Sequence, residues 1–488
     1  MKLKNLINNI EILGIKGDLE TEVYGAASHS NHVSPGGIFF VLKGQKTHGR
    51  YYLAEAINNG ARVIISDEPL YDCPEGVTLI QVPSVREAMG KIAAKFYGHP
   101  AKYMTLVGIT GTNGKTTTSY LIASILNKAG FKVGIIGTIG YTYCGKNISA
   151  PMTTPESVEL QKLLKEMLDA GITHVVMEVS SHALARKRVA GCGFKIGLFT
   201  NLSRDHLDFH KDMKAYFYCK KRLFTDYLDG IGIINKEDNY GKKLLNLDIP
   251  FITYGLNRAD ITAKVIKMDL DGTEAEIGTP KGAFNINTLL LGMPNLANIM
   301  AATGAALCLG IDLIDIKAGI EAVSHVPGRL QRIFKNGIEV IVDYAHTPDA
   351  LRCALSTLRK FCSSRLITVF GCGGERDRGK RKIMGEIAGK LSDLVIITND
   401  NPRTEPPEQI TREIEIGLKH CKSPYFIIYD RKMAIRSAIK KARRGDMVLI
   451  AGKGHETYQI LGEKSCPFSD IEEVKKALDA EGLHLEMG

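Results

Sequence analysis

The chain has 488 residues, of which 44% are hydrophobic and 24% are charged, a composition typical of soluble globular proteins. Its length predicts about three domains. It contains no run of about 18 apolar residues, so we expect no transmembrane helix and no membrane association. The net charge of +10 would suit nucleic-acid binding, but no long basic run and no RNA-binding signature support that function.

The N-terminal segment MKLKNLINNIEILGIKGDLE has no sustained apolar core and no small-residue cleavage site, so we do not expect a signal peptide. The ten cysteines are scattered, without a C-x-x-C pair. This spacing argues against a zinc ribbon and against a disulfide framework. Both observations favour a cytoplasmic protein in reducing surroundings.

Residues 1–100 have the pattern of a small α/β domain. Short runs rich in β-branched and aromatic residues predict strands at 38–43 and 62–66. The segments AEAINNGA and REAMGKIAAKFYG show helical periodicity. Pro100 marks a plausible end of this domain.

Residues 101–327 alternate strands and helices, the pattern of a mainly parallel sheet. We expect strands at 104–109, 132–137, 173–179, 195–200 and 231–235. Residues 250–290 form a smaller, more β-rich excursion, and the segment 295–310 is a strong helix followed by another.

The stretch TLVGITGTNGKTTT at 105–118 predicts a buried strand, a glycine-rich turn and a helix start. Backbone N–H groups at such a helix start cradle phosphate, and the helix dipole favours the anion. The strict P-loop pattern fails, because Ile109 stands where it has a glycine, but the phosphate-binding half is intact. We therefore expect ATP to bind at Thr110, Gly111, Thr112, Asn113, Gly114, Lys115 and Thr116.

Polar residues follow several later strands of this region. Glu178 ends a strand, and a carboxylate beside a P-loop strand can hold magnesium. In the segment FTNLSRDHLDFH, His206 and His210 could bind a metal, but no third ligand is obvious, which favours a polar loop that faces the phosphates. Spacing alone suggests that Lys220 is a structural or solvated lysine on an amphipathic helix.

After the break VPGR at 326–329, residues 328–488 predict a second, Rossmann-like α/β domain. Its strands fall at 338–342, 365–370, 394–398, 425–429 and 447–450. Polar clusters follow these strands, and ligands of open parallel sheets bind at the carboxyl ends of strands. The basic cluster in GCGGERDRGKR, residues 376–382, suits a small anionic substrate.

In order along nearly the whole chain, the motifs are GTNGKTT, TTP, EVSSHAL, TNLSRDHLDFH, DYAHTPDAL, GCGGERDRGK, DNPR and GKGHE. With this set of motifs the chain resembles the Mur ligases, specifically the MurE type. The resemblance implies an α/β fold of three domains: a UDP-MurNAc-peptide-binding domain at 1–100, a central P-loop ATPase with a mainly parallel sheet at 101–327, and a Rossmann-like amino-acid-binding domain at 328–488.

The resemblance also implies an activity: ATP-dependent amino-acid ligation in cytoplasmic peptidoglycan precursor synthesis, by a protein we expect to be a monomer. ATP, with Mg²⁺, would phosphorylate the D-glutamate γ-carboxylate of UDP-MurNAc-L-Ala-D-Glu. The amine of meso-diaminopimelate would then attack the acyl phosphate. Because a carboxylate is a poor electrophile, phosphorylation supplies the leaving group, and catalysis consists mainly of positioning and charge neutralisation.

Roles carry over to the residues at matching positions. Lys115, Lys220 and His206 would be catalytic, Thr116 and Glu178 would bind magnesium, and Lys220 matches a carbamylated lysine whose new anion would bind a second magnesium. The nucleotide would also contact Asn295, Asn298, Arg329 and Asp343. The UDP-MurNAc-peptide would bind to Ser30, Thr153, Thr154, Ser180, Arg186 and Arg188. Diaminopimelate would bind to Arg376, Asp400, Asn401, Pro402, Arg403, Gly452 and Glu456.

Two departures from the family pattern stand out: His29-Ser30-Asn31 replaces a common Asp-Ser-Arg triplet, and Gln331 replaces a usual glutamate. The nearest alternative activity is L-lysine addition, by relatives that usually lack the arginine of DNPR. Folylpolyglutamate or cyanophycin synthesis is disfavoured by the DNPR motif and by chain length. A P-loop switch ATPase would hydrolyse ATP without any amino acid, and a pure binding module would not need Lys115 with Thr116.

Overall fold

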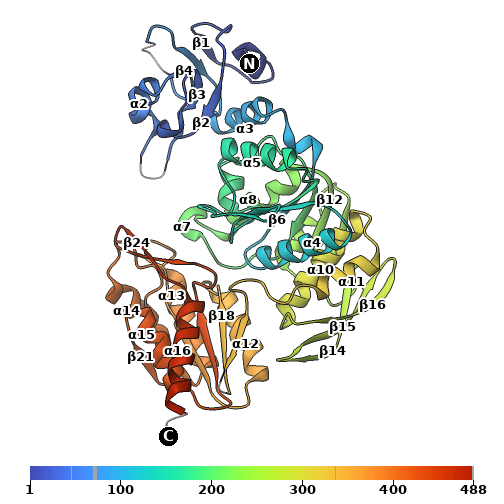
Figure 1. Ribbon diagram of the computed structural model, residues 1–488, viewed down its shortest axis with the longest axis vertical. Helices are drawn as coiled ribbons and strands as arrows, with labels where there is room; N and C mark the ends of the chain where they lie inside the picture. The colour runs from blue at the N-terminus through green and yellow to red at the C-terminus, as the bar shows by residue number, and fades with distance from the viewer. Residues whose placement is uncertain (45–46, 70–73, 336, 486–488) are drawn as a thin grey trace. The chain divides into compact units, whose positions relative to one another are not determined.

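The computed structural model describes residues 1–44, 47–69, 74–335 and 337–485 (Figure 1). It divides into two compact units. The first comprises residues 1–110, 130–198 and 219–232, and the second comprises residues 111–129, 199–218 and 233–488. Each unit is described by itself below.

The N-terminal part of the first unit is a five-stranded sheet in the order β1-β5-β4-β3-β2, parallel except for β1. Alternate residues of β3 face opposite sides: Ile38 and Phe40 pack with α1 and α3, while Phe39 packs with α2. The elements are α1 (Leu3–Ile7), β1 (Gly14–Lys16), β2 (Gly25–Ala27), η1 (Ser30–His32), β3 (Gly37–Phe40), η2 (Gly49–Tyr52), α2 (Leu53–Asn58), β4 (Ala61–Ser66), β5 (Thr78–Gln81), α3 (Val85–Phe96) and η3 (Pro100–Tyr103).

The rest of the first unit is built on strands that neighbour one another in the order β12-β11-β6-β10-β7-β8-β9. Strand β10 runs parallel to both β6 and β7, whereas β8 and β9 are antiparallel additions. The elements are β6 (Thr105–Thr110), β7 (Val133–Ile136), β8 (Tyr141–Tyr143), β9 (Lys146–Ile148), α5 (Ser157–Asp169), β10 (His174–Glu178), α6 (Ser181–Ala185), β11 (Phe194–Phe199), α8 (Met213–Asp226) and β12 (Leu228–Asn235).

The second unit begins with the helix that follows the glycine-rich turn. This helix, α4, packs against α10 and α11. Strands β14, β15 and β16 form a separate antiparallel sheet, which confirms the predicted β-rich excursion. The elements are α4 (Lys115–Lys128), α7 (Leu207–His210), α9 (Asn239–Leu244), β13 (Phe251–Tyr254), β14 (Thr262–Asp269), β15 (Gly272–Thr279), β16 (Gly282–Thr288), α10 (Met293–Cys308) and α11 (Leu313–Glu321).

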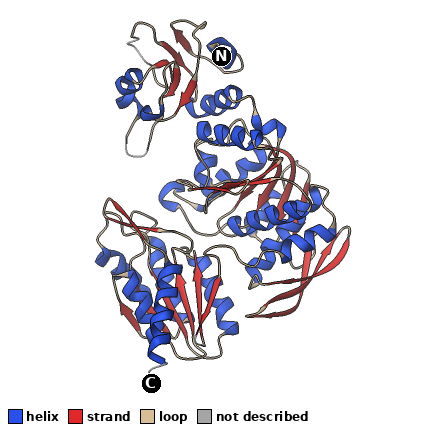
Figure 2. Ribbon diagram, in the orientation of Figure 1, coloured by secondary structure: helices blue, strands red, loops and turns tan. Residues whose placement is uncertain are grey.

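The C-terminal part of the second unit is a six-stranded sheet in the order β17-β18-β22-β19-β20-β21, with helices on both faces (Figure 2). Its elements are β17 (Gln331–Lys335), β18 (Ile338–Asp343), α12 (Pro348–Phe361), β19 (Leu366–Phe370), α13 (Gly379–Leu391), β20 (Leu394–Ile397), α14 (Pro407–Leu418), β21 (Tyr425–Ile427), α15 (Arg431–Lys441), β22 (Met447–Ala451), the hairpin β23 (Tyr458–Leu461) and β24 (Lys464–Pro467), and α16 (Asp470–Leu485).

Side-chain alternation along these strands supplies both faces of the C-terminal core. In β18, Ile341 packs with α12, α13 and α14, whereas Val340 and Val342 pack with α15 and α16. All five strands from β18 to β22 are parallel, so their carboxyl ends meet at one edge. The predicted arrangement of polar clusters along one sheet edge is therefore confirmed.

Candidate active site

The glycine-rich turn connects β6 to α4 as predicted, and α4 begins at Lys115. Gly111 has φ +147° and Gly114 has φ +87°, values that L side chains rarely adopt. A Cβ at Gly111 would overlap the Thr200 hydroxyl, so only glycine fits there. The ammonium group of Lys115 donates to the carbonyl oxygens of Gly111 and Thr112, each at 2.9 Å. The lysine is therefore held over the turn at a helix N-terminus, where anions are favoured.

The segment TNLS at 200–203 supports this turn. Thr200 donates its hydroxyl to the Asn113 carbonyl at 2.7 Å, and the Asn201 side chain accepts from the Asn113 N–H at 3.0 Å. Thr112 donates its hydroxyl to the Ser203 carbonyl at 3.2 Å. The sequence favoured a polar loop facing the phosphates over a metal site here, and the loop does lie against the turn. No metal-binding group of three or more His, Cys, Asp or Glu residues occurs in the described ranges.

Two predicted nucleotide residues, Asn295 and Asn298, lie on α10 and are buried. The Asn298 amide oxygen accepts from Thr118 at 3.3 Å, and a Cβ at Gly114 would overlap this oxygen. Asn298 also donates to the Asn295 amide oxygen at 3.4 Å. The structure thus places both amides at the first turn of α4 and makes Gly114 necessary for their approach.

The predicted hinge brings Arg329 to the same helix. Its guanidinium group donates to the Thr116 hydroxyl at 3.0 Å and lies 4.6 Å from the centre of the Tyr344 ring. Asp343 accepts from the Leu330 N–H at 2.7 Å, and burial raises the pKa of this carboxyl, although Arg329 opposes the shift. Arg329 and Asp343 therefore belong to one structural unit with the P-loop helix.

In the first unit, Glu178 ends β10 opposite Ile109 of β6, the position that the sequence predicted. The side chain is 1% exposed. Both of its carboxylate oxygens accept from Thr138, one from the backbone N–H at 3.0 Å and one from the hydroxyl at 2.9 Å. Neither donor carries a charge, so a bound cation would offset the cost of burying this carboxylate.

Threonine and serine hydroxyls gather beside this strand end. Thr154 donates to the Glu178 carbonyl at 2.8 Å and lies 3.4 Å from the Ser180 hydroxyl. Thr153 lies 3.1 Å from the Thr138 hydroxyl. The structure thus brings together Thr153, Thr154 and Ser180, three of the predicted peptide-binding residues.

The predicted arginine pair lies close to these hydroxyls. Arg188 is buried, donates to the Thr154 carbonyl at 3.1 Å and pairs with Glu156 at 2.8 Å. Glu156 is the N-cap residue of α5, but its side chain makes no cap hydrogen bond and binds Arg188 and Arg86 instead. Burial lowers the pKa of Arg186, and the neighbouring Arg188 lowers it further.

Lys220 is 1% exposed, although it lies on a helix with exposed lysines such as Lys214. Of the two interpretations from spacing, a solvated lysine is therefore wrong, whereas a structural lysine stays open.

His206 adopts a left-handed backbone conformation with φ +53°, and its Nε2 lies 3.2 Å from Asp205. Asp205 is buried, and it also lies 3.8 Å from His346 and 3.9 Å from Lys380. Burial alone would raise the pKa of Asp205, but His206, Lys380 and His346 outweigh it and hold the pKa well below its usual range. Local sequence pattern does not reveal this cluster, because His346 and Lys380 lie about 140 and 175 residues away from Asp205 along the chain.

The loop DNPR follows β20 and carries Arg403 in a left-handed conformation, φ +54°. The hairpin β23–β24 holds it there: the Arg403 N–H donates to Ile460 and its carbonyl accepts from Gly462. The guanidinium group donates to the carbonyl oxygens of Gly374 at 2.8 Å and Asn401 at 3.3 Å. Neither of these two acceptors is Asp400, which acts on Arg403 only from a distance.

The other predicted amino-acid-binding residues surround Arg403. The Gly374 N–H donates to the Asn401 carbonyl at 2.9 Å, and a Cβ at Gly374 would overlap the Pro402 carbonyl, so this loop closes on DNPR. A Cβ at Gly452 would lie 2.6 Å from the Asp400 carboxylate. The structure brings together Arg376, Asp400, Asn401, Pro402, Arg403, Gly452 and Glu456 at the carboxyl edge of one sheet.

The basic cluster at 376–382 was predicted to suit a small anionic substrate, but two of its arginines bind carboxylates of the protein itself. Arg381 is fully buried and binds Glu405 and Glu413, and Arg378 also binds Glu413. These charges are neutralised within the protein. Arg381 also donates to the Gly373 carbonyl at 3.2 Å, so its role is to tie the GCGG loop to helix α14.

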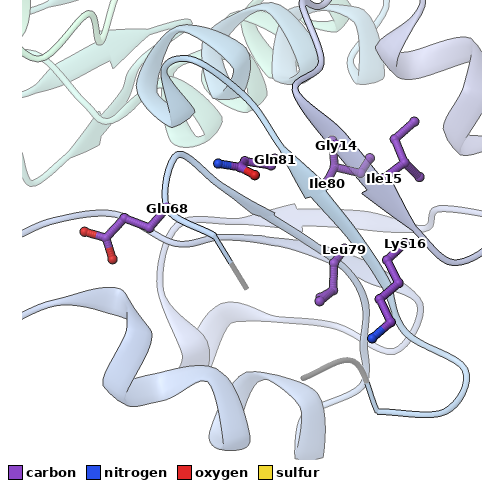
Figure 3. A pocket seen from close by; sticks show the side chains of 7 residues that line it. All are labelled: Gly14, Ile15, Lys16, Glu68, Leu79, Ile80 and Gln81. Atoms are coloured by element: carbon purple, nitrogen blue, oxygen red, sulfur yellow. The ribbon is translucent and has the colours of Figure 1, made fainter. Parts of the chain in front are cut away.

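A shallow hollow of about 190 Å³ lies at the edge of the N-terminal sheet (Figure 3). It is lined by Gly14, Ile15, Lys16, Glu68, Leu79, Ile80 and Gln81. No residue with a predicted ligand role lines it, and we assign no function to it.

Comparison with known proteins shows to which family the chain belongs. Three family models match successive parts of the chain: the Mur ligase family catalytic domain at 22–97, the Mur ligase middle domain at 109–306 and the Mur ligase glutamate ligase domain at 328–454. A curated relative from Geobacter metallireducens, named UDP-N-acetylmuramoyl-L-alanyl-D-glutamate–2,6-diaminopimelate ligase, is 44% identical over 502 residues and 98% of each chain. The chain belongs to the Mur ligase family.

Solved Mur ligases have the same fold. A UDP-N-acetylmuramoyl-L-alanyl-D-glutamate–2,6-diaminopimelate ligase structure aligns with a TM-score of 0.69 and 34% identity over 99% of each chain. A MurF ligase from Thermotoga maritima, in complex with ADP, aligns with a TM-score of 0.64 over 96% of this chain. The predicted three-domain α/β fold is confirmed, while the exact boundaries at 100 and 327 stay predictions. No helix in the described ranges is long and apolar enough to cross a membrane.

One departure from the Mur ligase pattern has a structural explanation. The Gln331 side-chain oxygen accepts from the Gly328 N–H at 2.9 Å. An amide oxygen can fill this role as well as a carboxylate. Gly328 itself must be glycine, since a Cβ there would overlap Gly454 and His455 of the GKGHE loop.

The other departure concerns the triplet around Ser30. Ser30 is buried, its hydroxyl donates to Glu55 at 2.7 Å, and its carbonyl accepts from Asn59 at 3.1 Å. These bonds fix the short turn that carries Asn31, whatever the substrate contacts of this Mur ligase are.

We expect Ser30→Ala to raise the KM for the UDP-MurNAc-dipeptide about threefold to tenfold, because one hydrogen bond that holds the turn is lost. The KM for ATP should stay unchanged. Steady-state kinetics with each substrate varied in turn measure both, with Ser34→Ala, at an exposed position nearby, as the control. An unchanged KM for the UDP-dipeptide would mean that other residues bind it.

Proposed function

We propose that this protein is an ATP-dependent ligase that joins meso-2,6-diaminopimelate to the D-glutamate of UDP-MurNAc-L-Ala-D-Glu. The names of its full-length relatives support this proposal. This reaction would belong to peptidoglycan precursor synthesis, and we propose that the enzyme is cytoplasmic and monomeric.

The surroundings of the Arg403 guanidinium group are the observation that supports meso-diaminopimelate, rather than L-lysine, as the amino acid that is added. Burial lowers the pKa of its guanidinium group, and the nearby Arg376 lowers it further. Its hydrogen bonds go to carbonyl oxygens, which carry no full charge. Asp400, Glu375 and Glu456 partly offset this shift from a distance, but neither of the two hydrogen-bond acceptors is a carboxylate. A ligand carboxylate would supply a direct counter-charge, and the planar guanidinium group suits a carboxylate in a bidentate geometry.

Meso-diaminopimelate differs from L-lysine by a carboxylate on the distal carbon, beside the distal ammonium group. In the proposed site Arg403 binds that carboxylate, and Asp400 and Glu456 face the ammonium group. A site built for such charges rejects an analogue that lacks one of them, because its own charged group is then left unpaired.

The proposed ATP site is the turn at 110–116 with Arg329 and Asp343. Magnesium requires hard oxygen ligands, and the hydroxyl of Thr116, the buried carboxylate of Glu178 and a carbamate on Lys220 would each supply them. When bound, the metal ion would neutralise charge on the transferred phosphoryl group.

The chain's own residues would then position the reactants. Lys115 places a cation at the N-terminus of α4, where phosphate oxygens are expected. The hydroxyls of Thr153, Thr154 and Ser180, with Arg186 and Arg188, would hold the UDP-MurNAc-dipeptide, and His206 would lie near the reacting groups. The proposed step forms an acyl phosphate on the glutamate, and the amine displaces phosphate from it.

Two alternatives predict different kinetics. An L-lysine-adding ligase would use L-lysine at least as well as meso-diaminopimelate. A switch ATPase would release phosphate at the same rate with or without the UDP-dipeptide and amino acid. A phosphate-release assay with and without each substrate separates the switch ATPase from both ligases.

We expect wild-type protein to prefer meso-diaminopimelate over L-lysine by about a hundredfold or more in kcat/KM, and Arg403→Asn to lose most of that preference. Ligation with saturating ATP and UDP-MurNAc-L-Ala-D-Glu measures both values. Arg412→Asn, at an exposed position on α14, is the matched control and should behave as wild type. Comparable use of both amino acids by the wild-type protein would contradict the proposed function.

A further inference from the structure

Lys453, in the loop AGKGHE after β22, is a buried cation beneath the amino-acid site. Its side chain is 0% exposed. The ammonium group lies 2.6 Å from the Glu456 carboxylate and 3.0 Å from the Asn401 amide oxygen. It also lies 5.4 Å from the centre of the Tyr458 ring. A charge buried this deeply is stable only when paired, so the lysine and its two partners form one electrostatic unit.

The two partners of Lys453 are both proposed amino-acid-binding residues. Asn401 donates its side-chain N–H to the same Glu456 oxygen that Lys453 binds, at 3.1 Å, and its amide oxygen also accepts from the Ile460 N–H at 2.9 Å. The second Glu456 oxygen has only a long contact with the Tyr344 hydroxyl, at 3.4 Å. Lys453 therefore fixes which carboxylate oxygen of Glu456 remains available for a ligand.

Lys453 also sets the charge of this region. Besides Lys453, the proposed site contains the cations Arg376 and Arg403 and the carboxylates Asp400 and Glu456. Lys453 adds one positive charge to this set, which suits a distal group that includes a carboxylate. Without that charge, a lone distal ammonium group is less strongly disfavoured.

We propose that Lys453 is a positioning residue that selects for an amino acid with a distal carboxylate over one with only a distal ammonium group. It acts through Glu456 and Asn401, whereas Arg403 binds the ligand directly. This proposal rests on the proposed function, since it assumes that the amino acid occupies this edge of the sheet.

The test replaces Lys453 by Gln, which keeps a hydrogen-bond donor but removes the charge, and by Met, which removes both. For each full-length variant, kcat and KM are measured with meso-diaminopimelate and with L-lysine. We expect the preference for meso-diaminopimelate in kcat/KM to fall at least about tenfold in both variants, with the KM for ATP within about twofold of wild type. Lys464→Met, at an exposed position in β24, should leave all values unchanged.

A double variant tests the route through Glu456. If Lys453 acts through this carboxylate, the change in preference caused by Lys453→Gln should be smaller in a Glu456→Gln background. Glu456→Gln alone leaves the lysine charge unbalanced, so L-lysine should lose more kcat/KM than meso-diaminopimelate. If neither Lys453 variant folds, the Glu456→Gln variant by itself tests whether the Lys453 charge affects the choice of amino acid.

Each contrary result has a distinct meaning. An unchanged preference in folded Lys453 variants, or an equal loss for both amino acids, would overturn the selective role and leave Lys453 with a structural one. A Glu456→Gln variant whose preference for meso-diaminopimelate does not rise above that of the wild-type protein would also overturn this role. Failure of the proposed function itself appears in the wild-type protein, as an absence of preference for meso-diaminopimelate.

Discussion

Replacing Lys115 by alanine should abolish ligation, with kcat lowered by at least about a thousandfold. The transferred phosphoryl group spreads negative charge over its oxygens, and in the proposed site Lys115 is the cation beside them. The structure holds its ammonium group at the turn through the carbonyl oxygens of Gly111 and Thr112. Because the loss falls on phosphoryl transfer, formation of both ADP and ligated product should stop.

The control for this experiment lies on the same helix. Lys128, at the other end of α4, is exposed, and Lys128→Ala should retain wild-type turnover. Thermal melting of both variants shows whether the fold survives. Near-normal turnover of a folded Lys115→Ala variant would mean that the glycine-rich turn does not bind the phosphates of ATP.

If Lys220 is carbamylated and its new carboxylate binds the metal ion, Lys220→Ala should lower kcat by at least about a hundredfold. The side chain is buried, and a carbamate would replace its ammonium group with the hard oxygen ligands that magnesium prefers. Short carboxylic acids such as acetate should restore part of the activity, because they can occupy the gap left by the side chain.

Rescue distinguishes this role from a purely structural one. A lysine needed only for packing would give a variant that no carboxylic acid restores, and a dispensable lysine would give full activity. Lys214→Ala, at an exposed position on the same helix, is the matched control and should need no rescue. Rescue is the preferred measurement, because carbamates are labile and an intact-mass measurement can miss the adduct.

Local pattern was sufficient to predict most elements of the fold. The turn at 110–114 was predicted because glycine alone tolerates its backbone angles, and α4 begins at Lys115 as expected. Strand positions followed from runs of β-branched residues, as β10 at His174–Glu178 and β22 at Met447–Ala451 illustrate. Polar clusters after parallel strands then predicted which loops would share an edge, and DNPR and GKGHE do so.

The partners of charged side chains could not be predicted from local pattern, because they depend on contacts between residues far apart in the sequence. Lys220 has the spacing of a solvated lysine, yet it is buried. Arg381 has the appearance of an anion-binding residue, yet Glu405 and Glu413 neutralise it.

The amino-acid sequence by itself therefore determined the elements, their order and the residue types of the phosphate-binding turn, because backbone sterics and side-chain periodicity are local properties. The tertiary structure alone decided which charges remain available for a ligand. The Arg403 guanidinium group binds backbone carbonyl oxygens directly and carboxylates act on it only from a distance, whereas the Lys453 ammonium group is bound directly by Glu456. The physical reason is that the free energy of a charge depends on burial and on neighbours brought together only by folding.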